Sequence, residues 1–168
     1  VHLLQVDEAQ HKHGPDAPEV REALKRQDEN VGRIRKAIAD SGVADRTVLL
    51  IVGDHGFTKV ERNLNPNALL RDAGYIDVVD GKISTWRALV RTSGGSAGVY
   101  VRKREDLDGV RQALLRAAAV DGEVLYHVLE REDLDKLGYN PEAVFALEPS
   151  AGYAIVGTLA PELVHGVP

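Results

Sequence analysis

Residues 47–52, with the sequence TVLLIV, constrain the fold more than any other segment of this chain. Apart from its first residue the run is apolar, and it is rich in branched side chains. Parallel strands covered on both faces have this pattern, whereas strands with one wet face alternate apolar and polar residues. The run ends in the polar turn Gly53-Asp54-His55-Gly56. It therefore predicts a buried parallel strand that ends in an aspartate and a histidine.

A long helix is expected before this strand, and a second apolar run precedes the helix. Asp16 and Pro18 have the spacing of an N-cap and a first-turn proline, and Gly42 can end the helix. Residues 1–6, VHLLQV, predict a strand that ends at Asp7. Strand, helix and strand in this order form a right-handed crossover unit. The two strands should therefore be parallel, with their carboxyl ends at one edge of a sheet.

The remaining sequence predicts shorter elements without an internal repeat. Asn65-Pro66 begins a short helix that stops near Gly74, and Asp80-Gly81 indicates a hairpin. Further strands are expected at residues 85–90, 98–101, 124–129, 144–147 and 153–156, and further helices at residues 106–119 and 133–137. This order of elements predicts a single α/β domain over residues 1–168.

Composition excludes several classes of protein. A chain of 168 residues with 43% hydrophobic and 28% charged residues can bury a core. Its charges are interspersed and sum to −5, so it has no basic stripe for a nucleic acid polymer. No apolar run approaches the roughly 20 residues that span a bilayer. Because the chain begins inside an expected strand and has no methionine, we expect a fragment that lacks the N-terminal part of its polypeptide.

Two pairs of residues could hold metal ions. Asp7 and His11 would be roughly 13 Å apart in an extended chain, but a helical curl brings them to about 6 Å. Because the chain has no cysteine, a metal must be held by imidazole and carboxylate groups. Taken alone, Asp7 and His11 fit a structural role in a turn or cap at least equally well, and an isolated Asp54-His55 turn fits such a role better. Both pairs follow expected strands, where α/β proteins place ligands, and this favours a metal site.

These segments resemble motifs of the type I phosphodiesterase/nucleotide pyrophosphatase family of the alkaline phosphatase superfamily. Residues 7–15, DEAQHKHGP, are similar to its D-x-x-x-H-x-x-G-P motif, and residues 53–57, GDHGF, to its S/G-D-H-G-hydrophobic motif. His165-Gly166 stands where the family has a third motif. In the first motif, Gln10 replaces the glycine that often precedes the family's histidine, here His11. The resemblance implies the C-terminal part of a catalytic domain with a three-layer α/β/α alkaline-phosphatase-like sheet, partial because its N-terminal part is absent.

The resemblance also implies ligands for two divalent metal ions, which we expect to be zinc in the intact enzyme. Asp7, His11 and His165 would hold one ion, and Asp54 and His55 would help to hold the other. The family's remaining aspartate ligand and its nucleophilic threonine would lie upstream of this sequence. No catalytic nucleophile is therefore expected within the chain.

The implied function of the parent enzyme is hydrolysis of phosphodiester or pyrophosphate bonds in a small-molecule substrate, with this fragment inactive alone. The alternatives are a phosphomonoesterase, phosphonoacetate hydrolase or sulfatase-like member of the superfamily, or a non-catalytic binding domain with the same fold. The resemblance is compatible with a periplasmic or extracellular location but does not fix the compartment.

Overall fold

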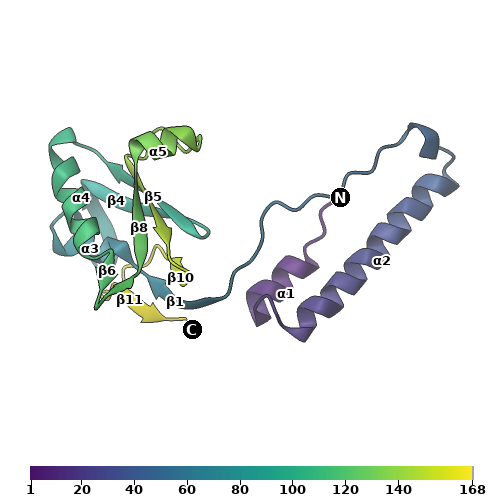
Figure 1. The fold of residues 1–168 in the computed structure, drawn as a ribbon, viewed down its shortest axis with the longest axis horizontal. Helices are drawn as coiled ribbons and strands as arrows, with labels where there is room; N and C mark the ends of the chain where they lie inside the picture. The colour runs from purple at the N-terminus through teal and green to yellow at the C-terminus, as the bar shows by residue number, and fades with distance from the viewer. Residues whose placement is uncertain (168) are drawn as a thin grey trace. The chain divides into compact units, whose positions relative to one another are not determined.

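The computed structural model describes residues 1–167, whose contacts divide the chain into two compact units (Figure 1). The first unit is Val1–Lys59, and the second begins at Val60. Within residues 1–167, no helix is long and apolar enough to cross a membrane. The mixed α/β class predicted from the sequence is confirmed. That both units belong to one catalytic domain stays a prediction.

The first unit consists of two helices and a long irregular segment. Helix α1 spans Gln5–His13, helix α2 spans Pro18–Asp40, and a 3-10 turn spans Ala44–Arg46. The long helix was predicted, and it starts at the proline, whose missing N–H costs nothing at this position. In α1, acidic residues occupy the first turn and basic residues the last, which complements the helix dipole.

Two predicted strands of the first unit are wrong. Residues 1–4 have no regular structure and residues 5–6 belong to α1, while residues 47–52 form no strand. A strand requires the backbone groups of a neighbouring chain segment. Within residues 1–167, no strand pairs with either run. The sequence pattern indicated a buried strand, but the partner that would define one is not among these residues.

The second unit contains three helices and eleven strands within residues 60–167. The helices are α3 (Pro66–Asp72), α4 (Leu107–Arg116) and α5 (Arg131–Lys136). The strands are β1 (Val60–Leu64), β2 (Ile76–Val79), β3 (Lys82–Trp86), β4 (Ala88–Ser93), β5 (Ser96–Val101), β6 (Ala119–Val120), β7 (Glu123–Val124), β8 (Tyr126–Glu130), β9 (Phe145–Pro149), β10 (Gly152–Ile155) and β11 (Val164–Gly166). The predicted strand at 85–90 is instead divided between β3 and β4, and the predicted helix at 106–119 is shorter.

The four-stranded antiparallel sheet β4-β5-β9-β8 is the centre of the second unit and separates two apolar clusters. Val99 and Leu147 face the larger cluster, which includes residues of α3 and α4. Their neighbours Tyr100 and Ala146 face the smaller cluster, which includes Leu134 of α5. Because successive side chains of a strand alternate between faces, α5 covers one face and α3 with α4 the other (Figure 1). This sheet is therefore the middle of three layers.

A smaller sheet, β10-β1-β11, carries the last candidate ligand. Strand β1 pairs with β10 in parallel and with β11 in antiparallel orientation, where Asn63 lies opposite His165. The fully buried Asn65 forms two hydrogen bonds with the segment that precedes β11. Its backbone N–H donates to Leu163 O at 2.7 Å, and its side-chain amide donates to Ala160 O at 2.6 Å. His165 is thus held on a strand whose approach is fixed by buried hydrogen bonds.

Candidate metal centre

Helix α1 brings Asp7 and His11 together. The two residues are four positions apart on the helix, which places their side chains one above the other on the same face. Asp7 Oδ1 lies 3.6 Å from His11 Nε2. The helical curl expected from the sequence is confirmed, although its cause is a helix that starts at Gln5 and not a turn after a strand.

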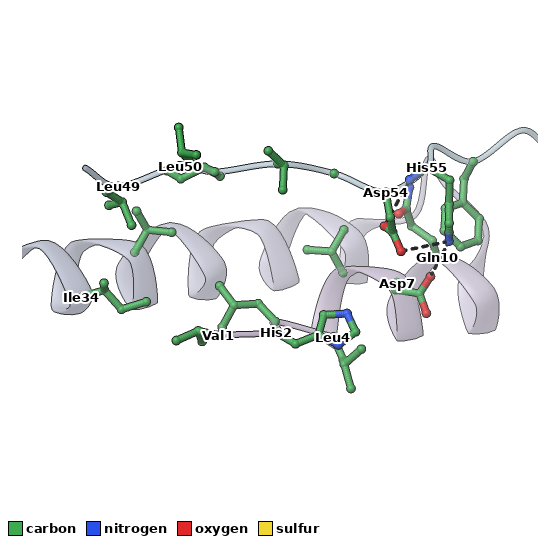
Figure 2. Close-up of a pocket in the computed structure, with 17 residues that line it drawn as sticks. Val1, His2, Leu4, Asp7, Gln10, Ile34, Leu49, Leu50, Asp54 and His55 are labelled. Carbon is green, nitrogen blue, oxygen red and sulfur yellow. Dashed lines mark hydrogen bonds and ion pairs between the residues drawn. The ribbon is translucent and has the colours of Figure 1, made fainter. Parts of the chain in front are cut away.

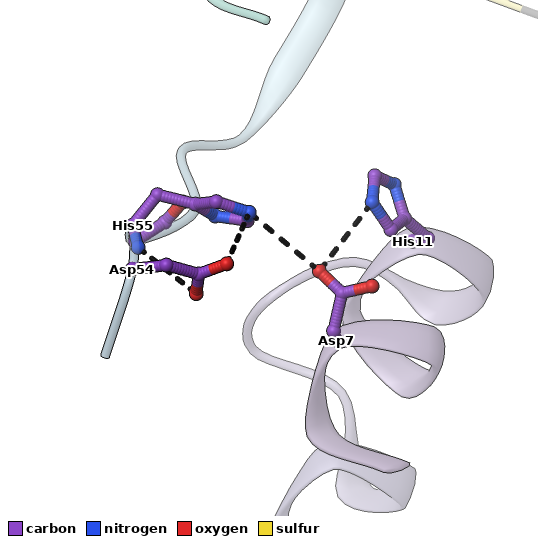
Figure 3. Close-up of polar contacts among 5 residues, drawn as sticks. Asp7, His11, Asp54 and His55 are labelled. Carbon is purple, nitrogen blue, oxygen red and sulfur yellow. Dashed lines mark hydrogen bonds and ion pairs between the residues drawn. The ribbon is translucent and has the colours of Figure 1, made fainter. Parts of the chain in front are cut away.

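The segment after residue 52 adds a second carboxylate and a second imidazole. His55 Nε2 lies 4.0 Å from Asp7 Oδ1 and 3.8 Å from Asp54 Oδ2. Figure 3 shows Asp7 between the two histidine rings, with Asp54 beside His55. Two carboxylates and two imidazoles from α1 and from a loop far along the chain therefore meet within the first unit. We call these four residues the carboxylate–imidazole cluster.

The donors of this cluster have the chemistry of a zinc site. Two donors bound to one tetrahedral zinc at about 2.1 Å lie about 3.4 Å apart. The Asp7–His11 distance of 3.6 Å is close to that value, and the distances of His55 to both carboxylates are longer by a few tenths of an ångström. Within residues 1–167, no three of the His, Asp and Glu side chains already form a metal-holding group. Asp7 with His11 and Asp54 with His55 are therefore each within a few tenths of an ångström of the separation that two ligands of one zinc ion require.

The histidine rings are oriented by the backbone that follows them. His55 Nδ1 lies 3.2 Å from Gly56 O, and His165 Nδ1 lies 3.2 Å from Gly166 O. A carbonyl can only accept, so each Nδ1 donates its hydrogen and the neutral ring keeps its lone pair on Nε2. In His55 this nitrogen is the one directed at both carboxylates. The second contact of a ligating histidine usually has this role of fixing the tautomer.

The charge state of Asp54 favours a ligand role. The hydrogen bond from its own backbone N–H is the main cause that lowers its pKa, and the backbone N–H of His55, which donates to Asp54 Oδ1 at 3.1 Å, lowers it further. Its side chain is 82% exposed, compared with 40% for Asp7, 57% for His55 and 69% for His11. Asp54 therefore stays ionised to lower pH than an ordinary aspartate, and the cluster is open to solvent.

Phe57 is a site residue that the sequence reasoning quoted only as part of a motif. Its ring centre lies 4.7 Å from that of His11 in an edge-on arrangement and 5.6 Å from that of His55. Phe57 thus contacts both imidazoles of the cluster and limits their rotation. The signal was present in the sequence, since the family motif has a hydrophobic residue at this position.

Gly53 and Gly56, which flank Asp54 and His55, adopt no conformation that requires glycine. Neither Gly53 nor Gly56 has a backbone angle in the left-handed region, and a Cβ at Gly56 would meet no atom within 4 Å. The turn at Asp54 and His55 thus needs no glycine conformation in this structure.

His165 belongs to the second unit and has a distinctive environment there. Its Nε2 atom is buried and has no hydrogen-bond partner within residues 1–167. Buried nitrogen atoms normally find a partner, and an isolated one calls for an explanation such as an ion. A metal ligand has this character, so the residue fits the role implied for it. The assignment of His165 to a site with Asp7 and His11 stays a prediction.

A family model and curated relatives both match this chain, and they name the same family. The model of the family described as type I phosphodiesterase / nucleotide pyrophosphatase matches residues 1–165. Ectonucleotide pyrophosphatase/phosphodiesterase family member 7 from Homo sapiens is 36% identical over 74 residues, covering 39% of this chain and 16% of that protein. Its Rattus norvegicus counterpart is 28% identical over 163 residues, covering 90% of this chain and 33% of that protein.

Solved structures support the same fold. Murine ectonucleotide pyrophosphatase / phosphodiesterase 5 matches with a TM-score of 0.66 at 18% identity, over 95% of this chain and 40% of that one. An inactive variant of that murine protein in complex with AMP matches with a TM-score of 0.67 at 18% identity. The likeness confirms the expected partial alkaline-phosphatase-like fold. The chain spans less than half the length of each of these relatives.

Proposed function

We propose that this chain, which belongs to the type I phosphodiesterase / nucleotide pyrophosphatase family, is the metal-binding part of a hydrolase of phosphodiester or pyrophosphate bonds. The observation that carries the proposal is the set of contacts that joins the cluster: Asp7 lies 3.6 Å from His11 and 4.0 Å from His55, and His55 lies 3.8 Å from Asp54. Two carboxylates and two imidazoles suit zinc, which takes nitrogen and oxygen ligands when thiolates are absent.

The proposed ligand sets follow the family resemblance. Asp7, His11 and His165 are the ligands of one divalent ion, and Asp54 and His55 are ligands of a second. The lone pairs on Nε2 of His55 and His165, fixed by the following glycine carbonyls, support this assignment. The chemistry that a pair of bound cations supplies is polarisation of the phosphoryl group and neutralisation of the leaving oxygen.

The residues of this chain have orienting roles in that reaction. Asp7 lies between the two imidazoles and can hold both in place through one oxygen. Asp54 remains an anion because its own N–H and His55 stabilise the charge. Phe57 shields one side of the histidine rings. We assign no nucleophile to this chain, and propose that in the parent enzyme a threonine outside these 168 residues attacks the phosphoryl group.

The proposed substrate is a small phosphoester that contains a nucleotide. An inactive variant of a murine relative has been solved in complex with AMP, and a nucleoside monophosphate is a product expected when a nucleotide diester or pyrophosphate is cleaved. Because 18% identity supports the fold alone, the substrate class depends on the cluster and on family membership.

The decisive experiment compares this chain with the longer polypeptide. Both proteins are incubated with zinc and with matched panels of nucleotide diesters, pyrophosphates, phosphomonoesters, phosphonoacetate and sulfate esters. We expect hydrolysis of diesters or pyrophosphates by the longer protein and negligible turnover by residues 1–168, although both bind zinc.

Each other outcome has a definite meaning. Faster turnover of monoesters, phosphonoacetate or sulfates would assign the protein to another branch of the superfamily. Zinc binding by neither protein together with no hydrolysis would identify a non-catalytic domain. Robust turnover by the 168-residue chain would mean that it contains a nucleophile, contrary to the proposal.

A further inference from the structure

The second unit contains a cavity that the proposed hydrolysis does not use. A cavity of the first unit has Asp7, Asp54 and His55 in its lining and belongs to the candidate metal centre (Figure 2). The cavity of the second unit has a volume of about 380 Å³ and shares no residue with that centre. Polar and aromatic side chains line it: Arg91, Thr92, Ser93, Tyr100, Tyr139 and Asn140. We call it the tyrosine pocket.

The tyrosine pocket lies on the face of the central sheet that α5 covers. Tyr100 faces the smaller apolar cluster, and Gly98, two positions earlier on β5, shares that face. Arg91 of β4 lies directly opposite Gly98, so it is on the same face. A Cβ at Gly98 would lie 3.3 Å from the hydroxyl oxygens of both Tyr100 and Tyr139. Glycine at this position therefore lets two hydroxyl groups approach the sheet beside Arg91.

The loop after α5 forms another wall of the pocket and is held by hydrogen bonds. Arg131 Nη1 donates to Asn140 O at 2.9 Å and to Ala143 O at 2.6 Å. The side-chain oxygen of Asn140 accepts from Glu142 N–H at 2.9 Å. The side-chain nitrogen of Asn140 donates to the hydroxyl oxygen of Tyr100 at 3.1 Å. This wall is thus formed without a ligand.

The pocket has hydrogen-bond donors that lack acceptors. Because the Tyr100 hydroxyl accepts from Asn140, its own hydrogen is left for a ligand, as is the second amide hydrogen of Asn140. Within residues 1–167, the Tyr139 hydroxyl has no hydrogen-bond partner and the Arg91 guanidinium has no ion pair. Of the described residues that line the pocket, Arg91 alone carries a charge, although the chain has a net charge of −5. Several donors and a cation without a carboxylate favour an anionic ligand.

We propose that the tyrosine pocket binds a tetrahedral oxyanion, the phosphate or sulfate group of a small organic ester. The guanidinium of Arg91 pairs with the anion, and the hydroxyls of Tyr100 and Tyr139 donate to its oxygens. These donors come from β4, β5 and the loop after α5, and donors on three chain segments suit a tetrahedral group better than a planar carboxylate. The two tyrosine rings provide contact area for the organic part of the ester.

The test uses the metal-free 168-residue chain, because zinc in the carboxylate–imidazole cluster would attract the same anions. Phenyl phosphate and phenyl sulfate supply a ring with a tetrahedral anion. Benzoate supplies the ring with a planar anion, and phenol supplies it without a charge. Isothermal titration calorimetry gives the affinity of each compound, and chemical-shift changes of backbone amides locate the site.

We expect saturable binding of phenyl phosphate, phenyl sulfate or both, weaker binding of benzoate and no detectable binding of phenol. The tighter of the two esters identifies the source of the anion. The amides that shift should be those of residues 91–93, 98–100 and 139–140.

Substitutions test the role of individual donors. Arg91→Gln should weaken ester binding at least about 10-fold, because it removes the charged donor. Arg116→Gln is the matched control, since it makes the same change on an exposed residue of α4 that does not line the pocket, and it should bind with unchanged affinity. Tyr139→Phe keeps the ring and should weaken binding about 2- to 10-fold. It remains informative if Arg91→Gln lowers the unfolding midpoint.

Four outcomes would overturn the proposal. Absence of saturable binding of both esters would mean that the pocket takes no such anion. Binding of phenol or benzoate as tight as that of the esters would mean that it recognises a ring or a planar acid. An equal loss in Arg91→Gln and Arg116→Gln would mean that the attraction is nonspecific. Amide shifts confined to residues 1–59 would place the anion in the first unit.

Discussion

Replacing Asp7 by asparagine should weaken zinc binding more than any other conservative change in the carboxylate–imidazole cluster. Asp7 Oδ1 lies 3.6 Å from His11 Nε2 and 4.0 Å from His55 Nε2, so one oxygen serves both imidazoles. Asparagine preserves the shape of the side chain and removes its charge. Loss of a partner in the outer shell of a metal site costs about 10- to 100-fold in affinity. Loss of a direct ligand should reach at least about 100-fold, or roughly 2.7 kcal/mol.

The assay is competition for zinc with a chromogenic chelator, at one fixed pH because metal binding releases protons. Glu8→Gln is the matched control: it makes the same change of charge on an exposed neighbour in α1. The control should bind zinc with unchanged affinity, and both variants should retain the helix content of the parent chain. Equal affinity of Asp7→Asn and the parent, or an equal loss in both variants, would refute the assignment of Asp7 as a ligand.

Three further predictions concern the supporting structure. Tyr126→Phe removes a buried 2.6 Å hydrogen bond to Leu114 O and should cost about 1 kcal/mol in urea unfolding. Burial raises the pKa of Tyr126, so the contribution of its neutral hydroxyl to the free energy of unfolding is complete below the ordinary pKa of tyrosine and is lost at higher pH. The variant should therefore lose less stability in alkali than the parent chain does. Equal losses would contradict this prediction. Asn65→Ala leaves Ala160 O unpaired and should cost about 1–3 kcal/mol, while an unchanged unfolding midpoint would refute the role of this side chain. Gly56→Ala should change stability and zinc affinity by less than about 0.5 kcal/mol, and a large loss of either would contradict the open space around this residue.

Local signals in the sequence predicted helices α2 to α5, whereas α1 was not predicted, because its first residues were expected in a strand. Pro18 marks the start of α2 and Gly42 follows its end, because a helix depends on hydrogen bonds between residues four positions apart. The turn at Asp80-Gly81 was also predictable, since both residues have positive φ between β2 and β3. The strands at 1–6 and 47–52 were not, because a strand is completed by a partner that is distant in sequence.

The residues of the candidate site could be predicted from the sequence, but the secondary structure and the aromatic contacts that hold them in place could not. The spacing of Asp7 and His11 placed them together under any helical conformation, and α1 supplies it. The meeting of this pair with His55 was inferred from two strands that do not form, yet the residues still converge. The contact of Phe57 with both histidine rings could not be read from spacing, because it depends on side-chain directions in a loop without regular structure.

The uneven distribution of the core has a consequence for how this chain melts. Of residues 1–59, only Val20 and Ala23 have buried apolar side chains, although α2 alone is 23 residues long. Nearly all of the apolar core belongs to the second unit. We therefore expect two thermal transitions, with α1 and α2 lost first. A ligand that binds only the folded form raises the temperature of its transition. Zinc should therefore shift the lower transition upward, so that calorimetry can detect occupancy of the cluster without a substrate.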